Sequence, residues 1–238
     1  MNNDYGLLWE KFIKTLIDKN GYKLVLEGLW NTIQIAVIGL LIGIVIGTII
    51  AIIRVMPKYK VLPRILDKIC GCYVELFRGT PMMVQLLIGY NVLLPVLGIS
   101  VDSGLPVAIV VFGLNSSAYV SEIMRGGINS VDPGQMEAGR AVGLSYWTTM
   151  LKIVIPQAIK NILPTIGNEF ISLIKETSVV SFITVVDLYT AFNTIGTNTY
   201  EVIIPYLFMA IIYILLVVII TLLIKLLEKG LAKSDRSH

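Results

Sequence analysis

Long apolar segments, separated by short charged stretches, dominate the pattern of hydrophobic and polar positions along the chain. The segments 29–53 and 202–224 contain no Asp, Glu, Lys, Arg or His, and a third uncharged segment covers 105–120. Weaker, broken apolar segments cover 74–97 and 163–183. An apolar run of about 18 or more residues predicts a transmembrane helix, because a helix satisfies its own backbone hydrogen bonds where water is absent. We therefore expect an all-α integral membrane protein with five transmembrane helices.

The stretches that flank these segments suggest how the chain is organised. Near the N-terminus, Leu8, Phe12 and Leu16 recur at helical spacing beside charged side chains, which predicts an amphipathic helix on the membrane surface. We expect an N-terminal surface segment at residues 1–27, a transmembrane domain at 28–228 and a tail at 229–238. A polar loop is expected inside the transmembrane domain, at residues 126–156.

Lysine and arginine are unevenly distributed among the loops. Neither residue occurs between Arg78 and Arg125, nor between Lys175 and Lys225, whereas basic residues cluster in the loops that alternate with these stretches. Basic loops resist translocation and therefore belong on the cytoplasmic side. With five spans, this distribution predicts an N-terminus outside and a C-terminus in the cytoplasm.

Composition excludes several classes of function. The chain is 55% apolar with a mean hydropathy of +0.80, and its formal net charge of +3 is too small to indicate nucleic-acid binding. The phosphate-binding pattern G-x-x-x-x-G-K-[ST] does not occur, so by that signature this is not an ATP-binding chain. Cys70 and Cys72 are expected to be small buried apolar residues, and no metal site is predicted.

The polar loop after Asp132 has the pattern of two short helices. Asp132 suits the N-cap of the first helix, with Pro133 at its first position and Gln135 placed for a capping box. Gly143 suits the left-handed residue that ends such a helix, and Ser145 then caps the second. Small and aromatic residues side by side predict a docking surface for another protein, although a stable loop without a partner would show the same pattern.

This loop resembles the EAA loop of bacterial ABC-importer permeases, whose pattern is E-A-A-x-x-x-G, nine residues and then I-x-L-P. The matching residues are Glu137, Ala138, Gly139, Gly143, Ile153, Ile155 and Pro156. Gly139 stands where the family has Ala and Ile155 where it has Leu, so the two positions remain small and aliphatic.

Three further motifs resemble the polar amino-acid subfamily of these permeases. They are Glu75-Leu76-Phe77-Arg78-Gly79-Thr80-Pro81 with Gln85; Tyr119, Glu122 and Arg125-Gly126-Gly127-Ile128 with Gly134-Gln135; and Lys175-Glu176-Thr177-Ser178. The resemblance therefore extends over nearly the whole chain.

The resemblance implies a five-helix permease bundle in the bacterial cell (inner) membrane that is not itself an enzyme, with no catalytic residue and no cofactor. A cytoplasmic ABC ATPase would bind ATP and Mg and dock on the loop. A second permease copy, identical or a close paralogue, and an extracellular or periplasmic amino-acid-binding protein would complete the assembly. The expected ATPase contacts are Glu137, Ala138, Gly139, Gly143, Leu144, Ser145, Tyr146 and Trp147.

Polar residues inside membrane spans are costly, so those in the third and fourth spans are candidates for a substrate site. The candidates are Asn115, Ser116, Tyr119, Asn168 and Glu169. A carboxylate at Glu169 would favour an amino acid with a second positive charge, namely arginine, lysine or histidine. Alternatively, these groups only hydrogen-bond between helices, and Glu169 pairs with Lys175 or caps a broken helix.

Four further charged residues receive a gating or structural role: Glu75, Arg78, Lys175 and Glu176. The predicted function is the permease subunit of an ATP-driven polar amino-acid importer that works by alternating access. The alternative is an ion-coupled secondary amino-acid transporter, but five spans without an internal repeat are unusual for that class. A membrane scaffold without transport has no reason to carry charges inside its spans.

Overall fold

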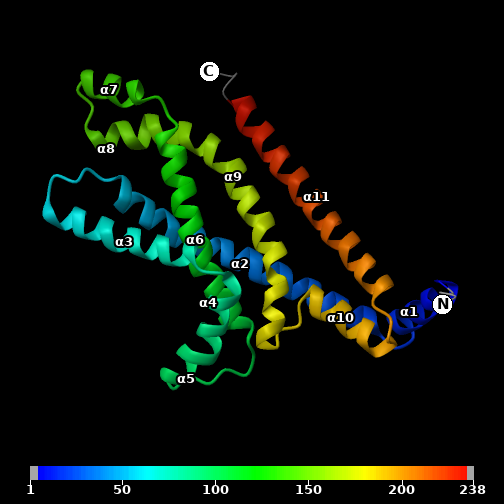
Figure 1. The fold of residues 1–238 in the computed structure, drawn as a ribbon. Helices are drawn as coiled ribbons and strands as arrows, with labels where there is room; N and C mark the ends of the chain where they lie inside the picture. The colour runs from blue at the N-terminus through cyan, green and yellow to red at the C-terminus, as the bar shows by residue number, and fades with distance from the viewer. Residues whose placement is uncertain (1–4, 235–238) are drawn as a thin grey trace. The chain divides into compact units, whose positions relative to one another are not determined.

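The computed structural model describes residues 5–234, and every regular element in this range is a helix (Figure 1). The α-helices are α1 (Tyr5–Ile17), α2 (Gly21–Val55), α3 (Val61–Gly79), α4 (Met82–Ile88), α5 (Leu94–Val96), α6 (Leu105–Asn129), α7 (Pro133–Ala141), α8 (Tyr146–Thr149), α9 (Ile155–Glu176), α10 (Leu188–Thr199) and α11 (Ile203–Ser234). Two π-helical turns, η1 (Gly89–Leu93) and η2 (Met150–Val154), and a 3₁₀-helix, η3 (Thr177–Ile183), join some of them. The predicted all-α fold is confirmed.

The number of membrane spans is less clear-cut than the fold class. Within residues 5–234, α2, α6 and α11 are long and apolar enough to cross a membrane, and α3 with α4 and α5 reaches the same standard only as one broken span. The helix α9 is not among them, and its sequence mixes charged and polar residues with the apolar ones, at Gln157, Lys160, Asn161, Asn168 and Glu169. The count of five spans therefore stays a prediction.

The chain divides into two compact units, and each is assembled from three separate segments. Unit 1 consists of Met1–Gly39, Pro81–Phe112 and Ser172–Ile219, and unit 2 consists of Leu40–Thr80, Gly113–Ile171 and Ile220–His238. Because the segments alternate along the chain, the packing inside each unit is set by contacts between residues that are distant in the sequence.

The N-terminal helix α1 forms part of the core of unit 1. Phe12 is buried with Leu188 and Phe192 of α10, and its ring lies 4.9 Å from that of Phe208 in α11. The predicted amphipathic helix therefore exists, and its apolar face packs on protein. Its position on a membrane surface stays a prediction, as does the boundary at residue 27, since α2 begins at Gly21.

Unit 1 also holds a buried helix start at Asp187, whose carboxylate accepts hydrogen bonds from the backbone N–H groups of Tyr189 and Thr190, at 3.0 and 2.9 Å. Gly28 of α2 lies against the Asp187 carbonyl so closely that a Cβ there would clash with it. Close packing at Gly28 and an N-cap at Asp187 together fix α10 beside α2.

In unit 2, α2 packs directly on α6 through two glycines. A Cβ at Gly43 would lie 2.7 Å from the Ser116 hydroxyl oxygen, and a Cβ at Gly47 would lie 2.8 Å from the Ser117 carbonyl oxygen. Small residues four positions apart let two helices approach to backbone contact. Here the glycine stripe serves packing within one chain.

The structure corrects the prediction for the two cysteines and limits the prediction for the C-terminal tail. Cys72 on α3 is exposed and Cys70 only partly buried, so the expectation of two buried cysteines is wrong for Cys72. The face of α3 that carries Val74 and Tyr73 enters the core with Ile50 and Ala118, and Cys72 lies off that face. Of the predicted tail at 229–238, residues 229–234 continue α11, and residues 235–238 lie outside the described residues.

Candidate functional site

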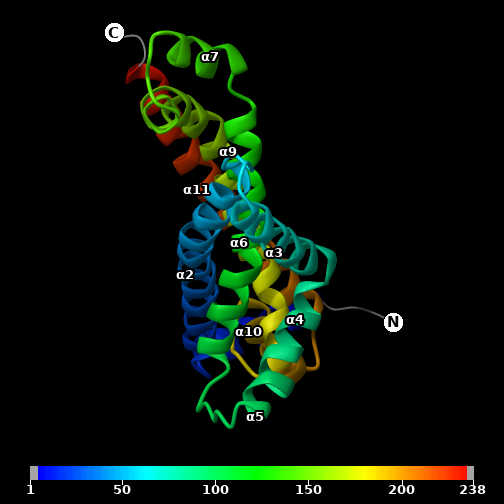
Figure 2. The same cartoon turned by 90° about the vertical axis from the view of Figure 1, so that its left-hand side faces the viewer.

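The loop after α6 folds into the predicted pair of short helices, α7 and α8, which form a hairpin at one end of α6 (Figures 1 and 2). Asp132 caps α7 by accepting a hydrogen bond from the Gly134 N–H at 2.8 Å, and Ser145 caps α8 by accepting one from the Thr148 N–H at 3.2 Å. Both predicted N-caps are confirmed.

The end of α7 has the predicted left-handed glycine. Gly143 has φ of +87°, its N–H donates to the Arg140 carbonyl, and the Leu144 N–H donates to the Gly139 carbonyl. This pair of hydrogen bonds defines a Schellman motif. The Arg140 guanidinium closes the turn from the other side by donating to the Leu144 carbonyl at 2.9 Å. The direction in which α8 leaves α7 therefore depends on Gly143.

The capping box predicted at Gln135 does not form. The Asp132 carboxylate binds the second N–H of the helix, and the Gln135 side chain instead accepts a hydrogen bond from Gln157 of α9 at 3.2 Å. A side chain with a partner on a neighbouring helix is not available to fold back on its own cap, so a tertiary contact replaced the local one.

The hairpin is tightly closed on its inner side and apolar on its outer side. Gly139 contacts the buried Thr149 so closely that a Cβ would clash with the Thr149 side chain, which explains why a glycine is needed opposite this threonine. The exposed fractions of Val142, Trp147 and Leu151 are 77%, 49% and 60%. An apolar group of this kind on a polar hairpin is typical of a surface that binds another protein.

The other residues of the hairpin that were predicted to contact a partner are divided between its surface and its core. Glu137 and Ala138 are exposed, whereas Tyr146 packs on the buried cluster of Val131, Met150 and Val154. Burial raises the pKa of the Tyr146 phenol, and Tyr59 adds a smaller effect in the same direction. Tyr146 and Trp147 meet edge to face, with ring centroids 5.3 Å apart.

The second helix of the hairpin continues into α9 without a break. The π-helical turn η2 precedes Pro156, and the Ile155 N–H donates to the Met150 carbonyl five residues earlier. A widened turn accommodates a proline that can neither donate to the preceding turn nor pack tightly against it. The helical segments α8, η2 and α9 therefore follow one another without an intervening loop.

The predicted substrate residues are not all together. Ser116 of α6 is fully buried and donates a hydrogen bond to the Glu169 carboxylate of α9 at 3.0 Å, so these two predicted residues meet. Asn168 is exposed, and Asn115 donates to the Phe77 carbonyl of α3 at 3.3 Å. Tyr119 lies beneath the Arg78 guanidinium, which is 5.3 Å from its ring centroid.

A network of charges surrounds Glu122, one turn beyond Tyr119 on α6. The Glu122 carboxylate binds the guanidinium groups of Arg54 and Arg125, the latter at 2.7 Å, and lies 3.9 Å from that of Arg78. Asp67 extends the network by pairing with Lys58 at 2.6 Å, and it lies 4.0 Å from Arg54. Three arginines around one carboxylate neutralise it and join α2, α3 and α6.

A polar pocket of about 430 Å³ opens beside this network. Its lining residues are Arg54, Gly71, Val74, Glu75, Arg78, Gly79, Tyr119 and Glu122. Sequence reasoning found Glu75, Arg78 and Tyr119 but assigned no role to Arg54. The sequence around Arg54 gives little indication of a pocket, because a basic residue directly after an apolar span is ordinarily a membrane-surface anchor.

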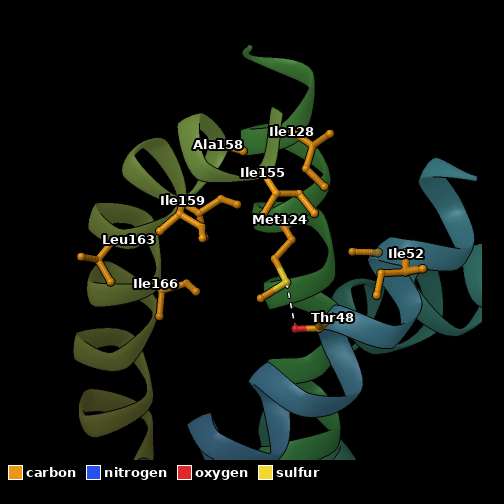
Figure 3. A pocket seen from close by; sticks show the side chains of 11 residues that line it. Thr48, Ile52, Met124, Ile128, Ile155, Ala158, Ile159, Leu163 and Ile166 are labelled. Atoms are coloured by element: carbon orange, nitrogen blue, oxygen red, sulfur yellow. Dashed lines mark hydrogen bonds between the residues drawn. The ribbon is translucent and has the colours of Figure 1, made fainter. Parts of the chain in front are cut away.

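A second pocket in unit 2, of about 310 Å³, is apolar (Figure 3). Isoleucine side chains from α2, α6 and α9 line it, and the Thr48 hydroxyl on its wall is satisfied by the Ile44 carbonyl and the Met124 sulfur, as the dashed line to Met124 shows. Such a surface has no group that could orient a polar substrate.

The remaining predicted charges, Lys175 and Glu176, belong to unit 1, where both side chains are exposed at the start of η3. Neither forms an ion pair with any residue in the described part of the chain. Their predicted gating or structural role stays a prediction. Within residues 5–234, no group of three or more His, Cys, Asp or Glu side chains could hold a metal ion.

Residues 39–233 match the family described as binding-protein-dependent transport system inner membrane component. The chain belongs to this family, and the resemblance to ABC-importer permeases that the motifs indicated is confirmed.

Individual relatives cover almost the whole chain. The arginine transport system permease protein ArtQ of Bacillus subtilis (strain 168) is 38% identical over 211 residues, which are 89% of this chain and 94% of that protein. A putative glutamine transport system permease protein GlnP of Rickettsia conorii is 38% identical over 205 residues, or 86% and 91% of the two chains. A solved amino acid ABC transporter with histidines has 36% identity and a TM-score of 0.81, over 90% of this chain and 97% of that one.

Proposed function

We propose that this chain is the permease subunit of an ATP-driven importer of polar amino acids, which exposes its substrate site alternately to the two sides of the membrane. Membership of the inner-membrane family supports the transport role, and relatives named for arginine and glutamine transport support an amino-acid substrate. A binding protein outside the membrane would deliver the amino acid, and a second permease copy would complete the pathway.

The construction of the α7–α8 hairpin supports a role in coupling to the ATPase. Its exposed apolar group of Val142, Trp147 and Leu151 would dock in a cytoplasmic ABC ATPase, in which ATP and Mg bind. Closure of the ATPase would move α8, and the unbroken path through η2 would pass that movement to α9. The two states of the permease then differ in how they expose the site on α6 and α9.

The contact between Ser116 and Glu169 carries the substrate proposal. It places a carboxylate and a buried hydroxyl between α6 and α9, at positions that lie within the predicted membrane spans. A carboxylate can bind an ammonium or guanidinium group by a charge-assisted hydrogen bond, so a cationic ligand would be favoured there. We therefore infer that the importer prefers arginine, lysine or histidine over glutamine.

Reconstitution in liposomes with the ATPase and the binding protein tests this proposal. Glu169→Gln keeps the shape of the side chain and removes its charge, so uptake of arginine should fall about tenfold to a hundredfold more than uptake of glutamine. Glu10→Gln, an exposed carboxylate on α1, is the matched control and should change neither rate. Equal uptake of both substrates by a folded Glu169→Gln variant would exclude a cationic preference.

The same liposomes test the energy source. Uptake should require ATP on the ATPase side and should continue when ion gradients are dissipated. Uptake that persists without ATP and stops on dissipation of the gradients would instead indicate an ion-coupled secondary transporter.

We also propose that the N-terminus lies outside and that the C-terminus and the hairpin lie in the cytoplasm, on the distribution of Lys and Arg. In a variant without Cys70 and Cys72, an impermeant thiol reagent added outside should label a cysteine at Ser103 or Asn198. Labelling at Ser130 from that side would reverse the orientation.

A further inference from the structure

The polar pocket beside Glu122 is lined by acidic and basic side chains, and these side chains differ in how closely they are paired with one another. Glu122 itself is neutralised, because Arg54 and Arg125 both bind its carboxylate. Arg78 is held more loosely: it lies 3.9 Å from Glu122, and 45% of its side chain remains exposed. Its guanidinium lies over the Tyr119 ring, 5.3 Å from the ring centroid, and its exposed N–H groups can still donate to an anion.

Glu75 supplies the opposite charge in the same pocket. It lies three residues before Arg78 on α3, so the two side chains are on one face of that helix. Both line the pocket, yet Glu75 forms no ion pair with Arg78 or with any other residue that the structure describes. The pocket therefore presents one carboxylate and one guanidinium on adjacent turns.

A ligand that matches this pair must have an ammonium group and a carboxylate close together, which is the common part of every free α-amino acid. A phosphate or another simple anion would meet repulsion from Glu75, and a metal ion would meet repulsion from Arg54 and Arg78. The volume of about 430 Å³ is within the range of small-molecule sites.

We infer that this pocket is a second amino-acid site, in which Arg78 binds the α-carboxylate and Glu75 binds the α-ammonium group. The inference rests on the proposed function, and it adds a site that recognises the amino-acid backbone. Glu169 would recognise the charged side chain. Tyr119 of the pocket and Ser116, which binds Glu169, lie on neighbouring turns of α6.

The two sites differ in what they recognise, so two probes separate them on the unmodified protein. Agmatine has the guanidinium and an ammonium group of arginine but no carboxylate, so it should bind at Glu169 and much more weakly at the pocket, where Arg78 would have nothing to bind. Glycine has the backbone charges without a side chain and should bind only at the pocket. In equilibrium dialysis of the full chain in nanodiscs, saturating agmatine should leave glycine binding unchanged, and labelled arginine should bind at two sites per chain.

Variants then assign each probe to its residues. Glu75→Gln and Arg78→Gln should each weaken glycine binding by about tenfold or more and leave agmatine binding intact, which also shows that the variants are folded. Arg78→Lys should restore part of the glycine affinity, because it keeps the charge and loses the planar fork. Lys68→Gln, an exposed basic residue on the same helix, should change neither probe. Glu169→Gln should have the reverse effect.

Three results would each overturn the second site. They are a stoichiometry of one bound arginine per chain, full competition between agmatine and glycine, and unchanged glycine binding in Glu75→Gln and Arg78→Gln. Displacement of labelled arginine from the pocket by phosphoethanolamine but not by glycine would also overturn it, by showing a lipid headgroup site. Absence of arginine binding together with absence of arginine transport would mean that the proposed function is wrong, which is a separate result.

Discussion

The α7–α8 hairpin and the polar pocket of unit 2 are both rich in polar and charged residues, but their contacts differ in range. In the hairpin, the hydrogen bonds at Asp132, Gly143 and Ser145 join residues two to five positions apart. In the pocket, the pair of Arg54 and Glu122 joins residues 68 positions apart, on α2 and α6.

This difference teaches that similar compositions can be stabilised by different physics. The hairpin is fixed by backbone conformation and caps, so a substitution there changes local geometry. The network is fixed by charge balance between three helices, so the loss of one carboxylate leaves several cations without compensation. Four substitutions, from the largest expected effect to the smallest, test whether the distinction holds.

Removal of the Glu122 charge should have the largest effect. Glu122→Gln leaves Arg54 and Arg125 facing a neutral amide, and we expect a loss of about 2–3 kcal/mol in the free energy of unfolding. The loss is smaller than for a fully buried pair, because Arg125 is partly exposed. Thermal denaturation in detergent measures it. Glu137→Gln, an exposed carboxylate on α7, should change stability by less than about 0.5 kcal/mol. Equal midpoints for the two variants would contradict the role of the network.

Packing between α2 and α6, beside the network, should be almost as sensitive. Gly47→Ala places a Cβ against the Ser117 carbonyl oxygen and the Val120 side chain, and it should cost about 1–3 kcal/mol by the same measurement. Gly126→Ala on α6 meets no atom within 4 Å and should gain up to about 1 kcal/mol from helix propensity. A stabilising Gly47→Ala would show that the helices separate easily.

A backbone change in the hairpin should act locally. Gly143→Val forces a β-branched residue into φ of +87°, at a cost of about 1–2 kcal/mol. Hydrogen exchange at the Gly143 and Leu144 amides should therefore accelerate about 5- to 30-fold, while amides of α6 keep their rates. Gly143→Asn should have a smaller effect, because asparagine tolerates this region. Faster exchange throughout unit 2 would mean that the hairpin is not an independent local structure.

The outer part of the network should matter least. Lys58 binds Asp67 at 2.6 Å, but 44% of its side chain is exposed, and such pairs contribute about 0.5 kcal/mol or less. Lys58→Gln should thus leave the denaturation midpoint nearly unchanged, and raising the salt concentration should remove any remaining difference. A loss comparable to that of Glu122→Gln would show that the network acts as one undivided unit.

The sequence determined the features that depend on neighbouring residues. Apolar runs predicted the helices, and the identities of Asp132, Gly143 and Ser145 predicted the caps and the left-handed turn that the structure contains. These features follow from side-chain chemistry and allowed φ values within a few residues, so no knowledge of the fold is needed. The motifs likewise indicated the family, because each motif is a short stretch of neighbouring residues that can be recognised without the fold.

Only the tertiary structure decided which of the polar residues meet. Ser116 pairs with Glu169 as predicted for a shared site, but Asn115 binds a carbonyl of α3 and Tyr119 supports Arg78, although all three α6 residues lie at helical spacing. Likewise, Gln135 has the identity of a capping-box residue and binds Gln157 instead. Periodicity shows which face a residue occupies, whereas its partner depends on which helix packs on that face and at what height. That choice is made by contacts between residues that are dozens of positions apart, such as Gly43 and Gly47 against α6, and a local pattern does not encode it.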